Sequence, residues 1–132
     1  MNNCKKVVYT AIFGNKDTLK DPLYHNTDFD YVCFTDNKEL KSDIWEVRYS
    51  EPIHKDPVRS AKIFKVKPHE YFQKYDVSVW CDANFIICSD LNTFLNNFGT
   101  QANLLTFQHD QGRTCIYDEA KIIIQDKKDD PD

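Results

Sequence analysis

The sequence predicts an α/β domain with a mainly parallel sheet flanked by helices, and three observations support this prediction. Short apolar runs rich in β-branched and aromatic residues, typical of strands buried on both faces, recur along the chain. Stretches with helical spacing separate several of these runs, and strands that alternate with helices form parallel sheets. Polar residues follow directly after the strands, at the sheet edge where α/β proteins bind ligands.

The chain has the size of one domain. Its 132 residues, 41% of them hydrophobic and 14% aromatic, suffice for one compact core and are too few for two ordinary domains. We expect residues 1–125 to form that domain. Residues 126–132 are charged, contain a proline and lack apolar anchors, so we expect them to be a frayed tail.

The first three strands are predicted from apolar runs that end in turn-forming residues. Lys6–Phe13 is apolar enough to be a central strand, and Gly14 breaks it. Tyr31–Thr35 is the second strand, and Asp36 follows it in a turn that suits Asx chemistry. Trp45–Tyr49 alternates large apolar and charged residues, which indicates a short third strand.

A helix is predicted to begin at Asp56 and Pro57. This pair combines an N-cap acceptor with a proline at the first helical position. Pro68 ends the helix, since proline is not tolerated in a helix interior. Ala61 and Phe64 share one face of this helix, apart from its basic residues.

The same helix carries a concentration of positive charge in an otherwise acidic chain. Residues 55–67 contain five basic residues and the single acid Asp56. Arg59 and Lys62 are three residues apart and share a face, and Lys65 lies one turn further along. Such a face suits a diphosphate ligand, because ammonium and guanidinium groups donate charge-assisted hydrogen bonds to phosphate oxygens. A solvated charged face is the alternative interpretation.

The central motif of the sequence follows the fourth predicted strand, Tyr75–Cys81. The next residues are Asp82, Ala83 and Asn84, and then a second apolar run, Phe85–Cys88. In extended chain the side chains of Asp82 and Asn84 project to the same side, so both could bind one divalent cation, Mn²⁺ or Mg²⁺. The motif therefore suits a metal–phosphate site, and it equally suits a polar turn between two strands.

The carboxyl-terminal part is predicted to contain two helices and one strand. Ser89–Phe98 has helical spacing and stops at Gly99, and we expect its apolar side chains, Leu91, Phe94, Leu95 and Phe98, to belong to the core. Leu104–Phe107 is predicted to be a strand that carries His109 near its tip. That histidine suits a metal ligand, an acceptor-side group or a structural hydrogen bonder. Cys115–Gln125 is the last predicted helix.

Composition excludes several partners and locations. A net charge of −4 provides no general attraction to nucleic acid or acidic membranes. We find no signal sequence and no run of the roughly 20 apolar residues that a membrane span needs. The five cysteines form no C-x-x-C pair, and we expect buried free thiols at Cys33, Cys81 and Cys88. Free thiols favour a reducing compartment, so we expect a cytoplasmic protein.

Five blocks in order give the chain a resemblance to a known family. The blocks read VVYTAIFGNKD, DYVCFTD, DPVRSAKIFKVKPH, YDVSVWCDANF and HDQGRTCIYDEA. Together they resemble a glycosyltransferase-like family formerly catalogued as a domain of unknown function, with bacterial polysaccharide and plant mucilage-type hexosyltransferases among its relatives. The resemblance implies a GT-A-like, Rossmann-related fold, represented here by its donor-binding part.

The resemblance also implies a nucleotide-sugar donor, a saccharide or glycoconjugate acceptor and a divalent cation. Asp82, helped by Asn84, would hold the cation, and Arg59 and Lys62 would bind the donor diphosphate. Asp36 would accept hydrogen bonds from the ribose or base, although it equally suits a turn cap. The end of the first strand would lie along the nucleotide base, so Ala11, Ile12 and Phe13 would contact the donor. Ile12 in particular suits a core position as well.

Three alternatives stay open. The chain suits a non-catalytic nucleotide- or partner-binding domain, because Asn84 is neutral where the family motif more often has aspartate. A metal-dependent phosphoesterase would need more carboxylates than the sequence brings together. The chain also suits a catalytically incomplete piece of a longer transferase, in which apolar surface near the last helix would favour self-association as a homodimer. The catalytic base and the stereochemical outcome are not indicated.

Overall fold

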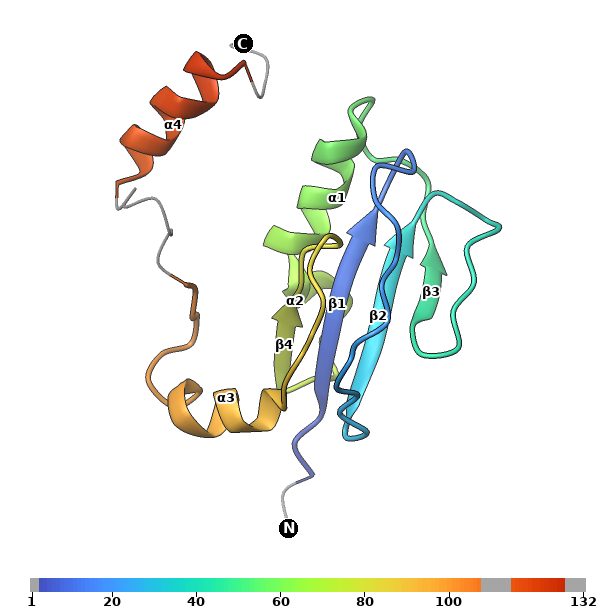
Figure 1. Cartoon of the computed structure of the whole chain (residues 1–132), viewed down its shortest axis with the longest axis vertical. Helices are drawn as coiled ribbons and strands as arrows, with labels where there is room; N and C mark the ends of the chain where they lie inside the picture. The colour runs from blue at the N-terminus through green and yellow to red at the C-terminus, as the bar shows by residue number, and fades with distance from the viewer. Residues whose placement is uncertain (1–2, 108–114, 128–132) are drawn as a thin grey trace. The chain divides into compact units, whose positions relative to one another are not determined.

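The structure is a computed structural model that describes residues 3–107 and 115–127. Within these residues, four strands form one sheet in the order β3-β2-β1-β4. The strands are β1 (Lys6–Ile12), β2 (Phe29–Thr35), β3 (Glu46–Tyr49) and β4 (Val77–Trp80), and every neighbouring pair is parallel. The helix that follows β3 packs against β1 (Figure 1). The predicted α/β class with a parallel sheet is confirmed.

β1 is central, as its apolar sequence predicts. It pairs with β2 from Lys6↔Phe29 to Ile12↔Thr35, and on its other side its first residues pair with β4. All residues of β1 after Lys6 are buried. Because the strands are parallel, their carboxyl ends lie at one edge of the sheet, which we call the carboxyl edge.

Two helices cover one face of the sheet. α1 (Pro57–Val66) contacts β1, and α2 (Pro68–Tyr71) follows it directly. The Phe64 ring of α1 is buried and stacks on Phe34, with 4.3 Å between centroids, and on Phe13, with 5.6 Å. Asp56 caps α1 by accepting from the Val58 N–H, and Pro57 is its first residue. The helix start predicted from sequence is confirmed, whereas α2, which begins at Pro68, was not predicted.

The long connection between β1 and β2 covers the other face (Figure 1). Its Lys20 carbonyl accepts a hydrogen bond from the indole Nε1–H of Trp45, which is buried edge-on against Tyr31. The backbone N–H groups of Leu23 and Tyr24 donate to the Ile87 carbonyl. The hydrogen bonds to Ile87 place the segment that follows β4 beside the β1–β2 connection. This segment forms no strand, and its Cys88 is exposed. Cys33 is buried and Cys81 half-buried, so the expectation of three buried thiols was wrong for Cys88.

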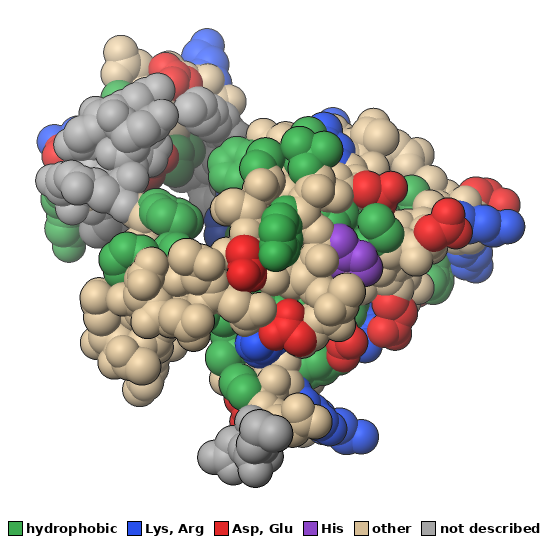
Figure 2. Space-filling model, turned by 60° about the horizontal axis from the view of Figure 1, so that its bottom comes forward, with side chains coloured by type: hydrophobic (Ala, Val, Ile, Leu, Met, Phe, Trp, Pro, Cys, Tyr) green, Lys and Arg blue, Asp and Glu red, His purple; other side chains and the backbone are tan. Residues whose placement is uncertain are grey.

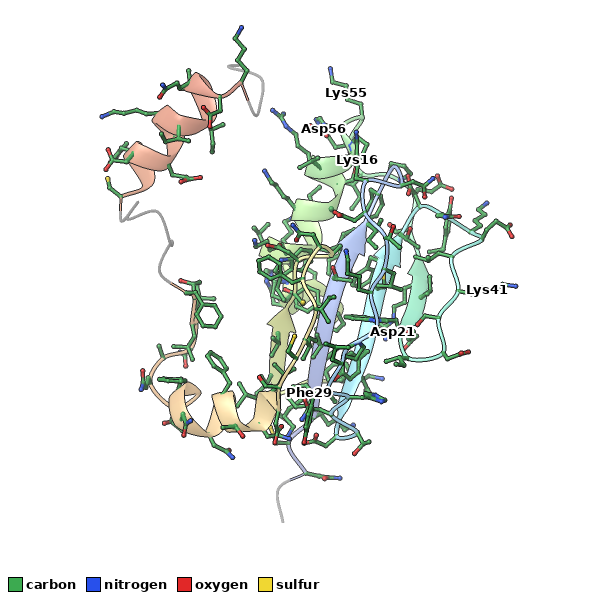
Figure 3. The ribbon with its side chains drawn as sticks, viewed as in Figure 1. Lys16, Asp21, Phe29, Lys41, Lys55 and Asp56 are labelled. Atoms are coloured by element: carbon green, nitrogen blue, oxygen red, sulfur yellow. The ribbon has the colours of Figure 1, made fainter. Side chains whose placement is uncertain are left out.

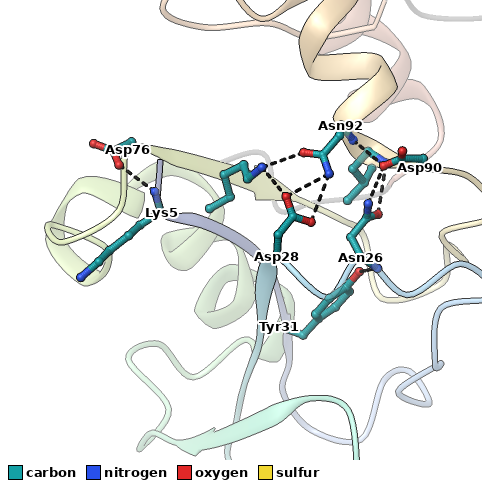
Figure 4. Close-up of polar contacts among 9 residues, drawn as sticks. Lys5, Asn26, Asp28, Tyr31, Asp76, Asp90 and Asn92 are labelled. Atoms are coloured by element: carbon teal, nitrogen blue, oxygen red, sulfur yellow. Dashed lines mark hydrogen bonds and ion pairs between the residues drawn. The ribbon is translucent and has the colours of Figure 1, made fainter. Parts of the chain in front are cut away.

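A polar network fixes the start of α3 (Leu91–Phe98) to the amino-terminal ends of β1 and β2 (Figure 4). The Asp28 carboxylate forms an ion pair with Lys6 and accepts hydrogen bonds from the Asn92 side-chain amide. Nearby, the Asn26 amide donates to Asp90. The hydrogen bond from Lys6 holds the pKa of Asp28 below its usual value.

The chain divides into two compact units, residues 1–93 and 94–132. In the second unit, the Phe94 ring contacts Phe98 and Phe107, with 5.3 and 5.5 Å between centroids. α4 (Ile116–Gln125) matches the last predicted helix. No helix in the described ranges is long and apolar enough to span a membrane.

Two predictions for this region were wrong. None of the α3 side chains is buried, so its apolar residues are not core residues. Residues 104–107 form no strand, and Leu104 and Phe107 are 81% and 85% exposed. Helical or strand-like spacing identifies side chains that share a face, but a neighbouring element must cover that face to bury it. His109 lies outside the described residues.

Candidate functional site

The carboxyl edge joins the ends of β1 and β2 to the start of α1. The Gly14 N–H donates to both carboxylate oxygens of Asp36, at 3.1 and 3.2 Å. Gly14 has a φ of 63°, and a Cβ built on it would lie 2.7 Å from Cγ of Pro57. Glycine is therefore required here, because the loop approaches α1 more closely than a side chain permits. Asp36 caps this loop, and its role toward a ribose or base stays a prediction.

Basic side chains from two segments occupy this edge. Figure 3 shows Lys16 of the β1–β2 connection near Lys55 and Asp56, which precede α1. Arg59, in the first turns of α1, lies 4.0 Å from the Asp56 carboxylate, measured from Nε to Oδ2. Lys62 is exposed. The positive charge predicted for α1 is thus extended by Lys16, which sequence reasoning did not select.

The three predicted donor contacts at the end of β1 are buried. Ala11, Ile12 and Phe13 belong to the core, and the Phe13 ring stacks on Phe64. Their side chains are therefore used in packing. A contact between this strand end and a nucleotide base stays a prediction, and in this conformation it would rely on backbone atoms.

Asp82 lies at the carboxyl end of β4, as predicted, and contacts two donors. Its Oδ1 accepts a hydrogen bond from Nε1 of Trp80 at 2.6 Å. The same oxygen lies 3.6 Å from Nζ of Lys65, at the last turn of α1. The carboxylate side chain is 46% exposed, so solvent and ligands can reach it. Lys65 and Trp80 are the residues of this site that sequence reasoning left unassigned, although Lys65 continues the face of Arg59 and Lys62.

The Asp82–Asn84 segment is a tight turn, not extended chain. The Phe85 N–H donates to the Asp82 carbonyl at 2.9 Å, and Ala83 and Asn84 occupy the turn, with Asn84 exposed. The side-by-side projection expected of extended chain is therefore wrong for this segment. Lys20 Nζ lies 3.4 Å from the Ala83 carbonyl, which links the turn to the β1–β2 connection.

Tyr9 contacts both neighbours of Asp82, Lys65 and Trp80. Its hydroxyl donates to the Lys65 carbonyl at 3.2 Å, and its ring meets Trp80 edge-on with 5.2 Å between centroids. Burial raises the pKa of Tyr9 to about 12, so its hydroxyl stays protonated as a donor. Burial, and then the Asp82 charge, also raises the pKa of Cys81, so this thiol is a poor nucleophile.

The oxygen atoms of Asp82 and Asn84 suit a cation that takes only part of its coordination shell from the protein. Within residues 3–107 and 115–127, no three histidine, cysteine, aspartate or glutamate side chains gather at one point. Asp82 and Asn84 offer oxygen ligands, which hard cations such as Mg²⁺ prefer, and phosphate oxygens and water commonly complete such shells.

A shallow cleft of about 800 Å³ lies at the opposite edge of the sheet, among the amino-terminal ends of the strands. Its lining mixes charges, and several of them are already paired: Tyr75 donates to Asp30, and Arg48 binds Glu46 through Nε at 2.8 Å. The face drawn in Figure 2 likewise carries both acidic and basic side chains among apolar and neutral ones. The exposed carboxylate beside basic residues at the carboxyl edge is the better candidate for phosphate chemistry.

Comparison with known proteins assigns the chain to a family. Neither a curated protein nor a solved structure matches it. The profile of the family described as TOD1/MUCI70, glycosyltransferase-like domain, matches residues 1–132, the whole chain. With its parallel sheet and polar carboxyl edge, this chain belongs to the TOD1/MUCI70 glycosyltransferase-like domain family.

Proposed function

We propose that the chain binds a nucleotide-sugar donor at the carboxyl edge and acts in hexose transfer to a saccharide or glycoconjugate acceptor, as a GT-A-type glycosyltransferase. The observation that carries this proposal is the position of Asp82. It is a half-exposed carboxylate at the end of a parallel strand, next to a basic helix, in a glycosyltransferase-like chain.

Asp82 and the side-chain oxygen of Asn84 would hold a divalent cation, Mn²⁺ or Mg²⁺. When bound, the cation would supply positive charge that offsets the donor diphosphate and stabilises the negative charge developing on the leaving nucleotide. Trp80 orients the Asp82 carboxylate through its 2.6 Å hydrogen bond. Arg59 and Lys62 would donate hydrogen bonds to the phosphates. Asp36 would either contact the ribose or continue to cap the Gly14 loop.

A second candidate is a domain of the same family that binds a nucleotide without transferring a sugar. The neutral Asn84 and the ion pair between Lys65 and Asp82 favour it, because both weaken the attraction of the site for a cation. The two functions share the donor site and differ in turnover of the bound sugar.

Calorimetry with UDP and GDP, in Mn²⁺ and in chelator, tests the proposal. We expect tighter nucleotide binding in Mn²⁺, and loss of that difference in Asp82→Ala. Asp43→Ala removes an exposed carboxylate from the β2–β3 connection and serves as the matched control. If the nucleotides bind with equal affinity in Mn²⁺ and in chelator, the proposed role of the metal is wrong. Hydrolysis of UDP-hexose and GDP-hexose, measured on the same samples, separates the enzyme from the binding domain.

A further inference from the structure

Lys65 occupies a particular place in the candidate site. Its ammonium lies 3.6 Å from Oδ1 of Asp82 and 5.7 Å from the centre of the Trp80 ring. Trp80 donates its indole N–H to the same oxygen. The proposed cation ligand is thus already neutralised by a positive charge from the protein.

A lysine and a divalent cation that share this carboxylate repel each other. Like charges a few ångströms apart repel, and the carboxylate that attracts Lys65 here would be shared with the cation. Cation binding to Asp82 therefore favours movement of the ammonium away from the carboxylate.

The lysine is free to make that movement while its backbone stays in place. Its carbonyl accepts the hydrogen bond from Tyr9, and its residue belongs to the last turn of α1. The side chain is 48% exposed, and four rotatable methylene groups carry the ammonium. An exposed ion pair of this kind is weak, so exchange of partners costs little.

The diphosphate of the donor is the next anion available to Lys65. Phosphate oxygens that share a cation with Asp82 would lie next to this carboxylate, within the reach of a lysine already there. A lysine that leaves a carboxylate for a phosphate keeps a charge-assisted hydrogen bond.

We propose that Lys65 is an exchangeable counter-ion: it neutralises Asp82 in the empty site, and moves to the donor diphosphate when a cation binds Asp82. The inference rests on the proposed function and adds a donor ligand to it. Its distinctive consequence is that Lys65 opposes cation binding and favours nucleotide binding, so its removal changes the two affinities in opposite directions.

The test compares the wild type with Lys65→Met, which keeps an unbranched stem of similar length beside Trp80. Lys67→Met is the matched control, because Lys67 follows the same helix, is 49% exposed and pairs with Glu70 at 3.3 Å. Titration of Mn²⁺ alone, read from the electron paramagnetic resonance signal of the free ion, gives cation affinity. Calorimetry of UDP at saturating Mn²⁺ gives nucleotide affinity.

We expect Lys65→Met to bind Mn²⁺ about two- to fivefold more tightly, the range that an exposed ion pair supports. It should bind UDP about tenfold more weakly, as expected for a lost charged hydrogen bond. Lys67→Met should match the wild type in both titrations.

Affinities that change in the same direction, or match the wild type, overturn the exchange while the metal role stands. If Lys67→Met also tightens Mn²⁺ binding and weakens UDP binding, the exchange is overturned, because the loss of any positive charge in this region then has the same effect. Absence of Mn²⁺ binding in every variant, with no nucleotide present, overturns the exchange, because Lys65 then opposes no cation in the empty site. The proposed metal role is decided separately, by the Mn²⁺ dependence of UDP binding in the wild type.

Discussion

Replacement of Gly14 by alanine tests the junction that joins β1, Asp36 and α1. Gly14 has a φ of 63°, and an alanine forced into this left-handed region loses about 1–2 kcal/mol. The new Cβ would lie 2.7 and 2.9 Å from two ring carbons of Pro57, which starts α1. Relief of such overpacking costs about 1–3 kcal/mol. We therefore expect Gly14→Ala to lower the free energy of unfolding by about 2–5 kcal/mol.

Urea unfolding followed by circular dichroism measures this loss, with Asn15→Gly as the control. Asn15 is the next residue and has a φ of 51°, so glycine relieves its strain while its hydrogen bond to Asn37, at 3.2 Å, is lost. These effects offset each other, and we expect a change below about 1 kcal/mol. A loss of less than about 1 kcal/mol in Gly14→Ala would refute the close approach of the loop to Pro57.

Three further predictions address the donor site, the core and the network at α3. Arg59→Ala should weaken UDP binding by about 1.5–3 kcal/mol and leave uridine binding unchanged, since a guanidinium contacts phosphate; calorimetry that finds equal losses for both ligands contradicts the assignment. Phe64→Ala should lower the free energy of unfolding by about 3–5 kcal/mol in urea, whereas Val66→Ala, at a 68% exposed position of the same helix, should cost under about 1 kcal/mol. Asp28 has a lowered pKa in the folded protein, so its contribution to stability is present above the unfolded pKa and is lost as the pH falls through the folded pKa. Urea midpoints below pH 4 should therefore fall less steeply for Asp28→Asn than for the wild type, and parallel slopes would exclude this contribution.

Local signals in the sequence were sufficient to predict the sheet and α1. The apolar run of β1 and the Asp56-Pro57 start of α1 depend on neighbouring residues, and each appears in the structure with nearly the predicted bounds. Phe64 is buried in the core, and Ala61, which shares its face by helical spacing, packs against that core. Polar residues after strands also identified Asp36 and Asp82, because the ends of parallel strands meet at one edge.

Features that depend on residues distant in the sequence could not be predicted from local patterns. Helical spacing in α3 identified an apolar face, but burial requires an element to cover it, and no α3 residue is buried. A polar turn was one of the two interpretations of Asp82–Asn84, and the backbone hydrogen bond that closes this turn and decides between them is not encoded in a side-chain pattern. Lys65 meets Asp82 only because α1 packs against β1, which pairs with β4, so its role emerges from the tertiary structure.

A crystal structure of the chain with UDP and Mn²⁺, with an anomalous difference map collected for manganese, tests the central claim most directly. We expect a manganese peak bonded to an Asp82 carboxylate oxygen and to oxygens of the diphosphate, with the nucleotide at the carboxyl edge. Nucleotide and manganese bound in the cleft at the amino-terminal ends of the strands, or a nucleotide at the carboxyl edge without a metal at Asp82, would contradict it.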